Sequence, residues 1–510
     1  MRRRDFLKWS LGGAATIVVG SRLPWLRGGA AFALEQGQVL DIVITDAIKE
    51  MVTHNAVNPA ECYFWVYRMS VSDGAAGPVA IPLECPGPTI VATKGDTITV
   101  NITNTLDEPH AFFIPGRLPG DPPIFSSHPI APNGGTFSGS FTVDQLGAFL
   151  YFDNLNAPVN RMMGLHGALV VMPDPNVPPG LGNKFTPYDD PTEAVQNLYN
   201  HFGDTDHFPG LAWEEGDPTP WALDPTVPNC PPFRTYVWLL HQASPNLFRE
   251  VGSLPAGAIF NPQEFMQKFL RSDFDPTNQA SFTPQYFTIN GQSGFFGHFS
   301  PTITPIGRVG EPVIVHILNA GLWTHSMHLH GDHFYVTSKN GVVQENLLWL
   351  DTFNVEPMDR VDYTVPFTRP ADCPNARGIG LPDLGLETDF GRRTWPPEEE
   401  FGVFFPAEGE DVAMDVNGNP VDLKQRLSPL CFPMHDHSEP SQTAQGGNYN
   451  LGLISGMYFT GDRTTPGFMD FPMDEDFHMM YRNIRGISAT GPAPGTEPPP
   501  LGAAHQAHTR

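Results

Sequence analysis

The sequence predicts an all-β protein built from two tandem Greek-key β-sandwiches. Three observations support this fold class. The 510 residues include 50 glycines and 54 prolines, so about a fifth of the chain favours turns over long helices. Only 16% of the residues are charged. Short apolar or alternating segments, each bounded by Gly, Pro or Asn, occur in two separate stretches of similar texture.

The first 33 residues have the pattern of an export signal. Arginines at positions 2–4 precede an apolar stretch from Leu11 to Gly20, and Ala31-Phe32-Ala33 offers a small-residue cleavage site. This pattern resembles a twin-arginine signal cleaved after Ala33, and it predicts a periplasmic or secreted protein. A basic, apolar N-terminal anchor is the alternative. The chain has no other run of 18 apolar residues, so we expect no membrane span after cleavage.

Residues 39–175 predict the first sandwich domain. They contain short stretches with the patterns of half-buried and fully buried strands. The expected strands are Val39–Thr45, Tyr63–Met69, Thr89–Val91, Asp96–Asn101, Gly135–Val143 and Gly167–Met172. Residues 176–231 follow as a connector rich in Pro and Asp, with a short helix expected at Thr192–Asn200.

Residues 232–462 repeat the strand pattern and predict the second sandwich domain. Its expected strands are Thr235–His241, Gln285–Ile289, Pro312–Asn319, His328–Thr337 and Val361–Val365. An insertion rich in Pro, Asp and Glu, at about 370–427, interrupts this domain. The tail at about 487–510 consists largely of Gly, Ala and Pro, and we expect it to be disordered because it has no apolar core.

The chain is strongly acidic, with 29 Lys and Arg against 55 Asp and Glu and a net charge of −26. Removal of the expected signal takes away six basic residues and one acidic residue, which leaves 23 against 54 and a charge of −31. Such a surface repels nucleic acid and anionic membranes. We therefore expect cations or neutral molecules as partners, and no nucleic acid.

Two histidine pairs in the second domain carry the strongest chemical signal. They are His328-Leu329-His330 and His435-Asp436-His437. Residues i and i+2 of a strand point to the same face, so each pair offers two imidazoles to one site. Imidazole nitrogen is a good ligand for copper. A lone histidine is usually a structural residue, but two such pairs favour a metal site.

Several motifs resemble the multicopper oxidase family, which is built from cupredoxin domains. In the first region they are Pro86-Gly87-Pro88-Thr89-Ile90, Lys94-Gly95-Asp96, Val100-Asn101-Ile102-Thr103-Asn104, Pro129-Ile130-Ala131-Pro132-Asn133-Gly134 and Gly147-Ala148-Phe149-Leu150-Tyr151. In the second region they are Phe287-Thr288-Ile289-Asn290-Gly291, the histidine-rich segment from Thr324 to Gly331, and Gly452-Leu453-Ile454-Ser455-Gly456-Met457. The resemblance covers about 370 residues, and it implies cupredoxin-like sandwiches.

The family's pattern has four His-x-His pairs for a trinuclear copper cluster, and a Cys, two His and often a Met for a type 1 copper. At the first two pair positions this chain has His110-Ala111-Phe112 and Phe152-Asp153-Asn154. The third and fourth pairs are present. Asp436 stands where the family has the type 1 cysteine, and His325 stands at a type 1 ligand position. The resemblance therefore implies a reduced copper site in the second domain.

Copper is the implied cofactor. The implied ligands are His328, His330, His435 and His437. His110, at the domain interface, is a further candidate ligand. His325 is either a further ligand or, like His333, a candidate for a residue that supports the ligands from behind. Asp436 either binds the metal through oxygen or orients a histidine. The His-Asp-His pair also resembles one in two-domain laccases, so a cluster completed by a second subunit of a homo-oligomer is an alternative. That neighbour would supply few ligands, because the first domain lacks three of four histidines.

The five cysteines cannot all pair within one exported chain. Cys62 and Cys85 flank a strand, a turn and a second strand, which favours a local disulfide. Cys431 has two interpretations. In the first, it is a ligand of a displaced type 1 copper site, together with His325, His435 and either Met434 or Met457. Alternatively it is a buried thiol or the disulfide partner of Cys373.

The resemblance implies a copper-dependent oxidoreductase. Its expected substrate is a metal ion (Mn, Fe or Cu) or a phenol, with dioxygen as an acceptor. Without a type 1 thiolate, the long-range electron relay of this family is missing. The alternative is therefore a copper-binding or copper-free envelope or scaffold protein on the same fold.

Overall fold

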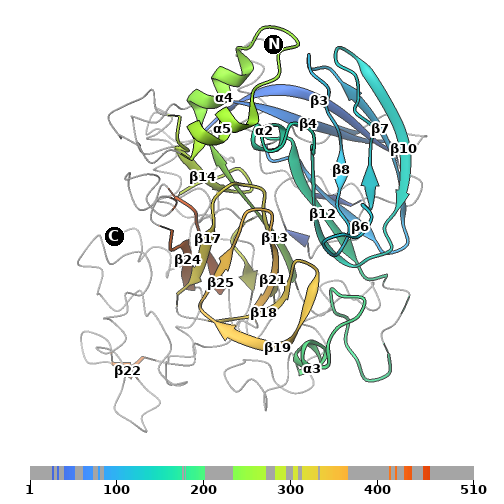
Figure 1. Ribbon diagram of the computed structural model, residues 1–510. Coiled ribbons are helices and arrows are strands. Elements are labelled where there is room, and N and C mark those ends of the chain that lie inside the picture. Colours follow the sequence, from blue (N-terminus) through green and yellow to red (C-terminus); the bar gives the residue numbers. More distant parts are fainter. Residues whose placement is uncertain are drawn as a thin grey trace, which may run out of the picture.

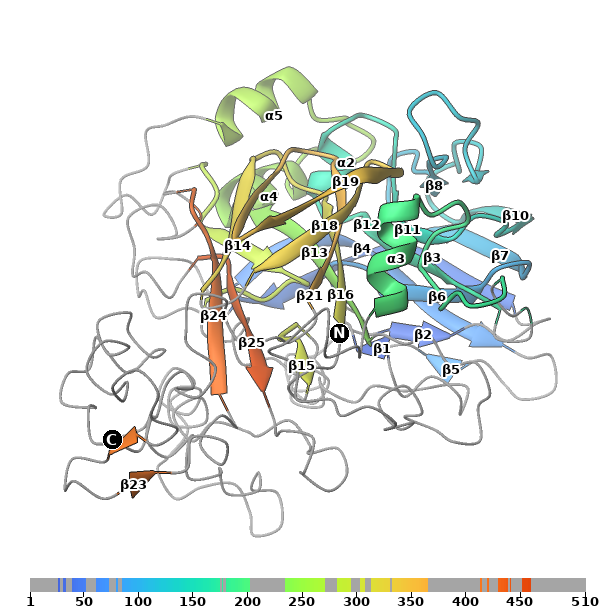
Figure 2. The same cartoon turned by 90° about the horizontal axis from the view of Figure 1, so that it is seen from below.

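The computed structural model describes the two predicted strand regions and short pieces around them. The described residues are 26–27, 31–33, 39–51, 61–72, 79–80, 85–174, 177, 180–201, 234–270, 282–294, 303–307, 313–330, 333–365, 413–414, 420–421, 430–438, 441 and 452–459. The protein is mostly β-structure, arranged as two sandwiches that lie side by side (Figures 1 and 2). This confirms the predicted fold class. The expected tail, Cys230 and Cys373 lie outside the described residues.

The first sandwich consists of a five-stranded and a six-stranded sheet. The five-stranded sheet has the order β10 (Gly135–Thr142), β7 (Thr97–Asn104), β3 (Val39–Glu50), β4 (Glu61–Ser72), β5 (Val79–Ala80). The other sheet has the order β2 (Ala31–Ala33), β6 (Thr89–Thr93), β12 (His166–Met172), β11 (Gly147–Phe152), β8 (Phe113–Ile114), β9 (Phe125–Ser126). In β7 every second residue is buried, whereas all of β12 is buried. The two patterns follow from one solvent-facing sheet and one covered sheet.

The second sandwich repeats this plan with a seven-stranded and a five-stranded sheet. The larger sheet has the order β1 (Leu26–Arg27), β13 (Arg234–Ala243), β16 (Val313–Asn319), β21 (Arg360–Val365), β18 (Phe334–Lys339), β19 (Val342–Leu350), with β14 (Tyr286–Ile289) beside β13. The smaller has the order β15 (Ile306–Gly307), β25 (Ile454–Phe459), β24 (Leu430–Asp436), β17 (His325–Leu329), β20 (Thr352–Val355). Two short strands, β22 (Ala413–Met414) and β23 (Pro420–Val421), pair within the insertion.

The sequence-based strand assignments agree with the observed strands to within a few residues, with one exception. Residues His328–Thr337 were expected to form one strand. That expectation is wrong, because β17 ends at Leu329 and β18 begins at Phe334, and the two lie in different sheets. Both strands place apolar residues in the shared core, so pattern alone does not separate them. The expected connector helix is confirmed as α3 (Glu193–His201).

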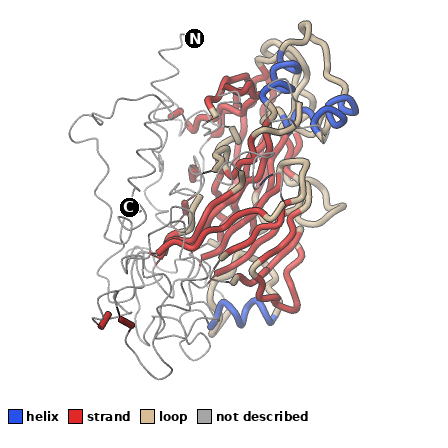
Figure 3. Tube along the Cα trace, turned by 90° about the vertical axis from the view of Figure 1, so that its left-hand side faces the viewer, coloured by secondary structure: helices blue, strands red, loops and turns tan. Residues whose placement is uncertain are grey.

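Helices lie at the ends of the strand-rich body (Figure 3). Besides α3 they are α2 (Val159–Met162), α4 (Pro245–Gly252) and α5 (Pro262–Phe269). Helices α4 and α5 begin at side-chain caps, where Ser244 and Asn261 accept backbone N–H groups. Phe248 of α4 and Phe265 of α5 are buried in the core of the first sandwich. The chain after β13 therefore returns to cover the first domain. None of the described helices has the length and apolar character of a membrane span.

Two arginines, one buried and one half-buried, join the two sandwiches. Arg161 of the first domain donates from Nη1 to the carbonyl oxygens of Ala320 (2.5 Å) and Gly321 (3.1 Å) in the second. In the opposite direction, Arg360 donates to the carbonyls of Ala148 (3.2 Å) and Arg117. These reciprocal contacts satisfy backbone carbonyls at the domain interface. Strands β1 and β2, which precede the expected cleavage site, occupy only sheet edges, so the two sandwiches are otherwise complete without them.

His166 is a packing residue of this interface, and it gives a testable pH dependence. Its side chain is fully buried beside His241, with ring centroids 4.5 Å apart, and its Nδ1 donates to the Arg161 carbonyl. Burial lowers the pKa of His166 from 6.5 to about 3. Between those values the unfolded chain binds a proton that the folded chain does not, so the free energy of unfolding falls as the pH falls.

We expect His166→Gln to remove this part of the pH dependence. One pKa unit corresponds to about 1.4 kcal/mol, so the wild type should lose roughly 2 kcal/mol more than the variant between pH 6.5 and 5. Urea unfolding at both pH values measures this difference. His128→Gln is the control, because His128 is exposed in the same domain. Equal losses in the wild type and His166→Gln would contradict the prediction.

Candidate metal centre

Four histidines gather where the neighbouring strands β17 and β24 meet. The strands are antiparallel, and His328 lies directly opposite His435. His330 and His437 come two residues after these partners, at the end of each strand. Leu329, the residue between His328 and His330, is 1% exposed and belongs to the core. Strand alternation therefore turns the histidine pairs away from the core and onto one common face.

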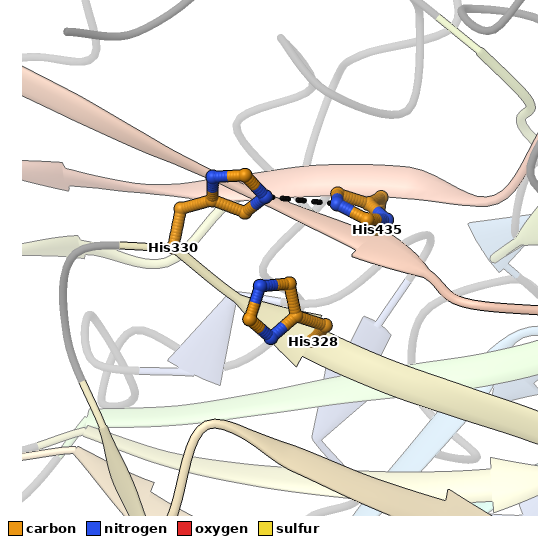
Figure 4. Close-up of side chains that lie close together, drawn as sticks. All are labelled: His328, His330 and His435. Carbon is orange, nitrogen blue, oxygen red and sulfur yellow. Dashed lines mark hydrogen bonds between the residues drawn. The ribbon is translucent and has the colours of Figure 1, made fainter. Parts of the chain in front are cut away.

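Three of the four rings lie close enough to hold one metal ion. The candidate ligand nitrogens of His328, His330 and His435 all lie within 4.8 Å of one another. Nε2 of His330 is 2.8 Å from Nε2 of His435 (Figure 4). His437 is exposed, and its ring centroid lies 4.7 Å from that of His328 and 5.0 Å from that of His435. His437 thus borders the three-histidine group on its solvent side.

Hydrogen bonds orient two of these rings. Nδ1 of His328 lies 3.0 Å from the carbonyl of Asp351 and 2.9 Å from the Thr352 hydroxyl. Nδ1 of His435 lies 3.1 Å from the carbonyl of Asp436. A carbonyl only accepts, so the proton resides on Nδ1 in both rings and Nε2 becomes the ligand atom. Ligating histidines are commonly held in this way.

The cluster keeps two of its imidazoles neutral. Burial, followed by the neighbouring histidines His435, His328 and His437, lowers the pKa of His330 to about 4. The pKa of His435 is also lowered to about 4, again mainly by burial. At neutral pH both rings therefore carry a lone pair instead of a second proton. A metal ion can bind without displacing that proton.

His325 lies on β17 but not in this group. It is fully buried, its Nδ1 donates to Oδ2 of Asp436 (2.6 Å), and its Nε2 accepts from the side-chain amide of Gln242 (2.7 Å). Both ring nitrogens therefore already have partners. Burial alone would raise the pKa of Asp436, but hydrogen bonds from His325 and Ser441 and the charge interaction with His325 outweigh it, and the net pKa is lowered.

His110 lies in the first sandwich, fully buried, with Nδ1 2.7 Å from Oδ2 of Asp153. Within the described residues His110 is not part of the metal-ligating group. The strand positions opposite each other in the first domain, equivalent to His328 and His435, carry Phe113 and Phe152. The first domain therefore offers two aromatic rings at the place where the second offers two imidazoles.

The structure describes the backbone of three of the five cysteines, namely Cys62, Cys85 and Cys431. Cys431 lies on β24, opposite Tyr458, four residues before His435 in an unbroken register. At 3.3 Å per residue the two backbones are about 13 Å apart. Cys62 and Cys85 are both buried thiols, so the expected local disulfide is absent from the structure. Burial and the nearby Cys85 raise the pKa of Cys62, which keeps that thiol protonated.

Sequence reasoning missed the groups that orient the cluster. Asp351 and Thr352 hold His328 although they lie more than 20 residues away in the chain. Gln242 reaches His325 from β13, in the opposite sheet. Neither spacing nor residue type marks them in the sequence. His333 was expected to support the ligands from behind, but its ring packs 5.4 Å from that of Trp349.

Comparison with known proteins places both domains in one family. Profiles of the multicopper oxidase family match residues 57–176 and 273–371. L-ascorbate oxidase from Cucurbita pepo var. melopepo is 36% identical over 96 residues, which are 18% of this chain and 17% of that protein. Monocopper oxidase-like protein SKU5 from Arabidopsis thaliana is 28% identical over 174 residues, 31% of this chain and 29% of that protein. The chain thus spans less than a third of these relatives.

Similar solved structures cover most of the chain at low identity. The blue copper oxidase from Nitrosomonas europaea has a TM-score of 0.44 and 15% identity, and the match covers 82% of this chain and 85% of that one. The copper nitrite reductase from Nitrosomonas europaea has a TM-score of 0.39 and 14% identity over 84% and 96% of the two chains. The profile matches fall one in each sandwich. The two matched domains thus belong to the multicopper oxidase family, and the cofactor of that family is copper.

Proposed function

We propose that the chain is a copper-dependent oxidoreductase with a single histidine-only copper centre in its second domain. The observation that carries this proposal is the convergence of the ligand nitrogens of His328, His330 and His435 within 4.8 Å. His437 is the fourth candidate ligand, at the exposed edge of the group. We do not include His110, His325 or Cys431, because their partners or their distance along β24 direct them elsewhere.

The residues present fit copper. The donor set consists of imidazole nitrogens, which suit this metal. Lowered pKa values keep His330 and His435 neutral, and hydrogen bonds direct Nε2 of His328 and His435 to the site. A histidine-bound copper ion supplies one-electron transfer between a reductant and dioxygen. The chain's own contribution is to fix the rings and to keep one side of the cluster open to solvent.

Residues beside the cluster support two classes of reductant. Trp349 is 44% exposed and stacks on Tyr335, with centroids 5.7 Å apart and an angle of 11° between the rings. Two residues later, Asp351 holds His328 through its carbonyl. This aromatic pair favours a phenol, which stacks on such a surface. The acidic surface, and the Asp351 carboxylate 3.8 Å from Nδ1 of His328, favour a metal ion instead.

A copper-binding or copper-free envelope or scaffold protein is the second candidate function. Two observations favour it: Asp436 stands at the thiolate position, and Phe113 and Phe152 occupy the equivalent strand pair of the first domain. We further propose export by the twin-arginine route, supported by the arginines at positions 2–4 and the apolar stretch after them. Fractionation of the expressing cells tests the location.

Metal analysis of the protein loaded with Cu²⁺ tests the proposed function. We expect about one copper per chain, a spin-resonance signal from nitrogen ligands, and no intense blue absorption band. Oxygen uptake with a phenol, and separately with Mn²⁺, Fe²⁺ or Cu⁺, identifies the reductant. Bound copper without oxygen uptake would favour the copper-binding alternative. Absence of copper after loading would exclude the oxidoreductase.

A further inference from the structure

Asp436 is the residue between the ligand candidates His435 and His437, at the position where the family resemblance implies a thiolate ligand. Its side chain is fully buried, whereas the histidines on either side of it face the cluster. Strand alternation directs it to the other face of β24, toward His325. The neighbour of two ligands therefore points away from the ligand site.

Four hydrogen bonds reach the Asp436 carboxylate. Oδ1 accepts from the backbone N–H groups of Ser326 (2.6 Å) and Ser438 (3.0 Å). Oδ2 accepts from Nδ1 of His325 (2.6 Å) and from the hydroxyl of Ser441. A carboxylate has about four acceptor positions. The donors within the protein therefore use all of them, and no lone pair is directed at a metal.

These bonds fix the two ligand strands to each other. Ser326 and His325 belong to β17, which leads to His328 and His330. Ser438 comes just after β24, which carries His435. One buried carboxylate thus sets the position of one strand against the other at the point where both ligand pairs begin. A shift of either strand would separate the imidazoles.

The first domain contains the same arrangement without metal ligands. His110 bonds Asp153 there (2.7 Å), as His325 bonds Asp436. Oδ1 of each aspartate accepts the N–H two residues later, from Leu155 and Ser438 respectively. The backbone N–H of each aspartate bonds an equivalent carbonyl, at 3.0 Å in the first domain and 3.1 Å in the second. The pair therefore has a structural role that is independent of metal.

On the basis of the proposed function, we infer that Asp436 and His325 are positioning residues: they form a clasp that holds β17 against β24, and neither binds copper. The residue at the position of the family's thiolate then has a structural role and is not a ligand. The centre consists of histidines alone, and its ligand geometry depends on a hydrogen-bonded pair that the protein uses twice.

The test compares Asp436→Asn with its matched control Asp153→Asn. We expect both variants to lower the melting temperature by similar amounts. Copper affinity, measured by chelator competition, should fall about 10- to 100-fold in Asp436→Asn, the range for lost groups that orient ligands. It should change less than about threefold in Asp153→Asn, because no ligand adjoins that pair. At saturating copper the spin-resonance spectrum of Asp436→Asn should match that of the wild type.

Three outcomes would overturn the inference. Unchanged copper affinity in Asp436→Asn, with copper bound by the wild type, would remove the positioning role and leave the proposed function intact. A changed spectrum at saturation would make Asp436 a ligand. Equal affinity losses in both aspartate variants would make the effect a general loss of stability. Wild-type protein that binds no copper would instead contradict the proposed function.

A milder variant covers the case in which Asp436→Asn does not fold. Ser441→Ala removes one of the four hydrogen bonds and keeps the carboxylate. We expect it to fold, to bind copper at least about twofold more weakly because one of the four bonds that hold the carboxylate is lost, and to keep the wild-type spectrum. Wild-type affinity in Ser441→Ala would count against the clasp.

Discussion

Replacement of His328 and His435 together by phenylalanine is expected to abolish copper binding and to leave the chain folded. The two residues lie opposite each other on β17 and β24 and supply two of the three converging nitrogens. Without them His330 has no partner ligand among the three. Phenylalanine has no lone pair to offer, and its ring has nearly the size and shape of the imidazole it replaces.

The first domain shows why this double variant should fold. Phe113 and Phe152 lie opposite each other on β8 and β11, as His328 and His435 do on β17 and β24. The two phenylalanine rings have centroids 5.4 Å apart at 71°, and the two imidazoles have centroids 5.4 Å apart at 75°. The sandwich therefore already holds an edge-to-face phenylalanine pair at this place, a favourable aromatic arrangement.

Two measurements and a control variant check this prediction. Copper content after loading should fall from about one per chain to less than about a tenth, because a site that loses two of its three ligands loses most of its affinity. The melting temperature of the metal-free variant should equal or exceed that of the metal-free wild type. His128→Phe, an exposed position, is the control and should keep its copper. Full copper content in the double variant would place the metal elsewhere in the chain.

The strands and the ligand pairs could be predicted because both depend on local patterns. Period-two alternation marks strands such as β7, and His-x-His directs two imidazoles to one face. The sequence also shows Asp436 at the position where the family's pattern has the type 1 cysteine. The pairing of β17 with β24 brings His328 opposite His435. This pairing cannot be predicted from either segment alone.

The groups around the ligands could not be predicted, because they come from distant parts of the chain. Gln242 reaches His325 across 83 positions. Helix α4 lies within the range predicted for the second domain but packs in the core of the first. One signal was present and was missed. Asn104 precedes His110 by six residues, and Asn319 precedes His325 by the same distance. Each asparagine side chain bonds the carbonyl four residues later, so this spacing marks the repeated His–Asp pair.

Arg161→Met should produce the largest loss of stability that we predict. The guanidinium is 6% exposed and binds two carbonyls of the loop that leads into β17, those of Ala320 and Gly321. Burial lowers the pKa of Arg161 to about 10, which still leaves it charged at neutral pH. Methionine keeps much of the apolar volume but donates no hydrogen bond, so both carbonyls lose a charged donor.

The expected loss in the free energy of unfolding is about 2–4 kcal/mol. Each hydrogen bond to a charged group contributes about 1.5–3 kcal/mol, and relief from burying the charge offsets part of the total. Urea unfolding measures this loss. Arg249→Met is the matched control: Arg249 is exposed on α4 and bonds only a nearby asparagine in the described structure, so its replacement should change stability by less than about 0.5 kcal/mol.

The same substitution should also weaken copper binding, because the loop bound by Arg161 is connected to the metal centre. The Leu322 N–H donates to Oε1 of Gln242 (2.8 Å), and the Gln242 amide holds His325, which in turn holds Asp436. Coupling through such a network is typically about 0.5–2 kcal/mol, which corresponds to a 2- to 30-fold rise in the copper dissociation constant. Chelator competition at a temperature where both proteins are folded measures it. A destabilised Arg161→Met protein with wild-type copper affinity would show that the interface and the centre are independent, and that the clasp on Asp436 is sufficient to hold the ligand strands without support from the first domain.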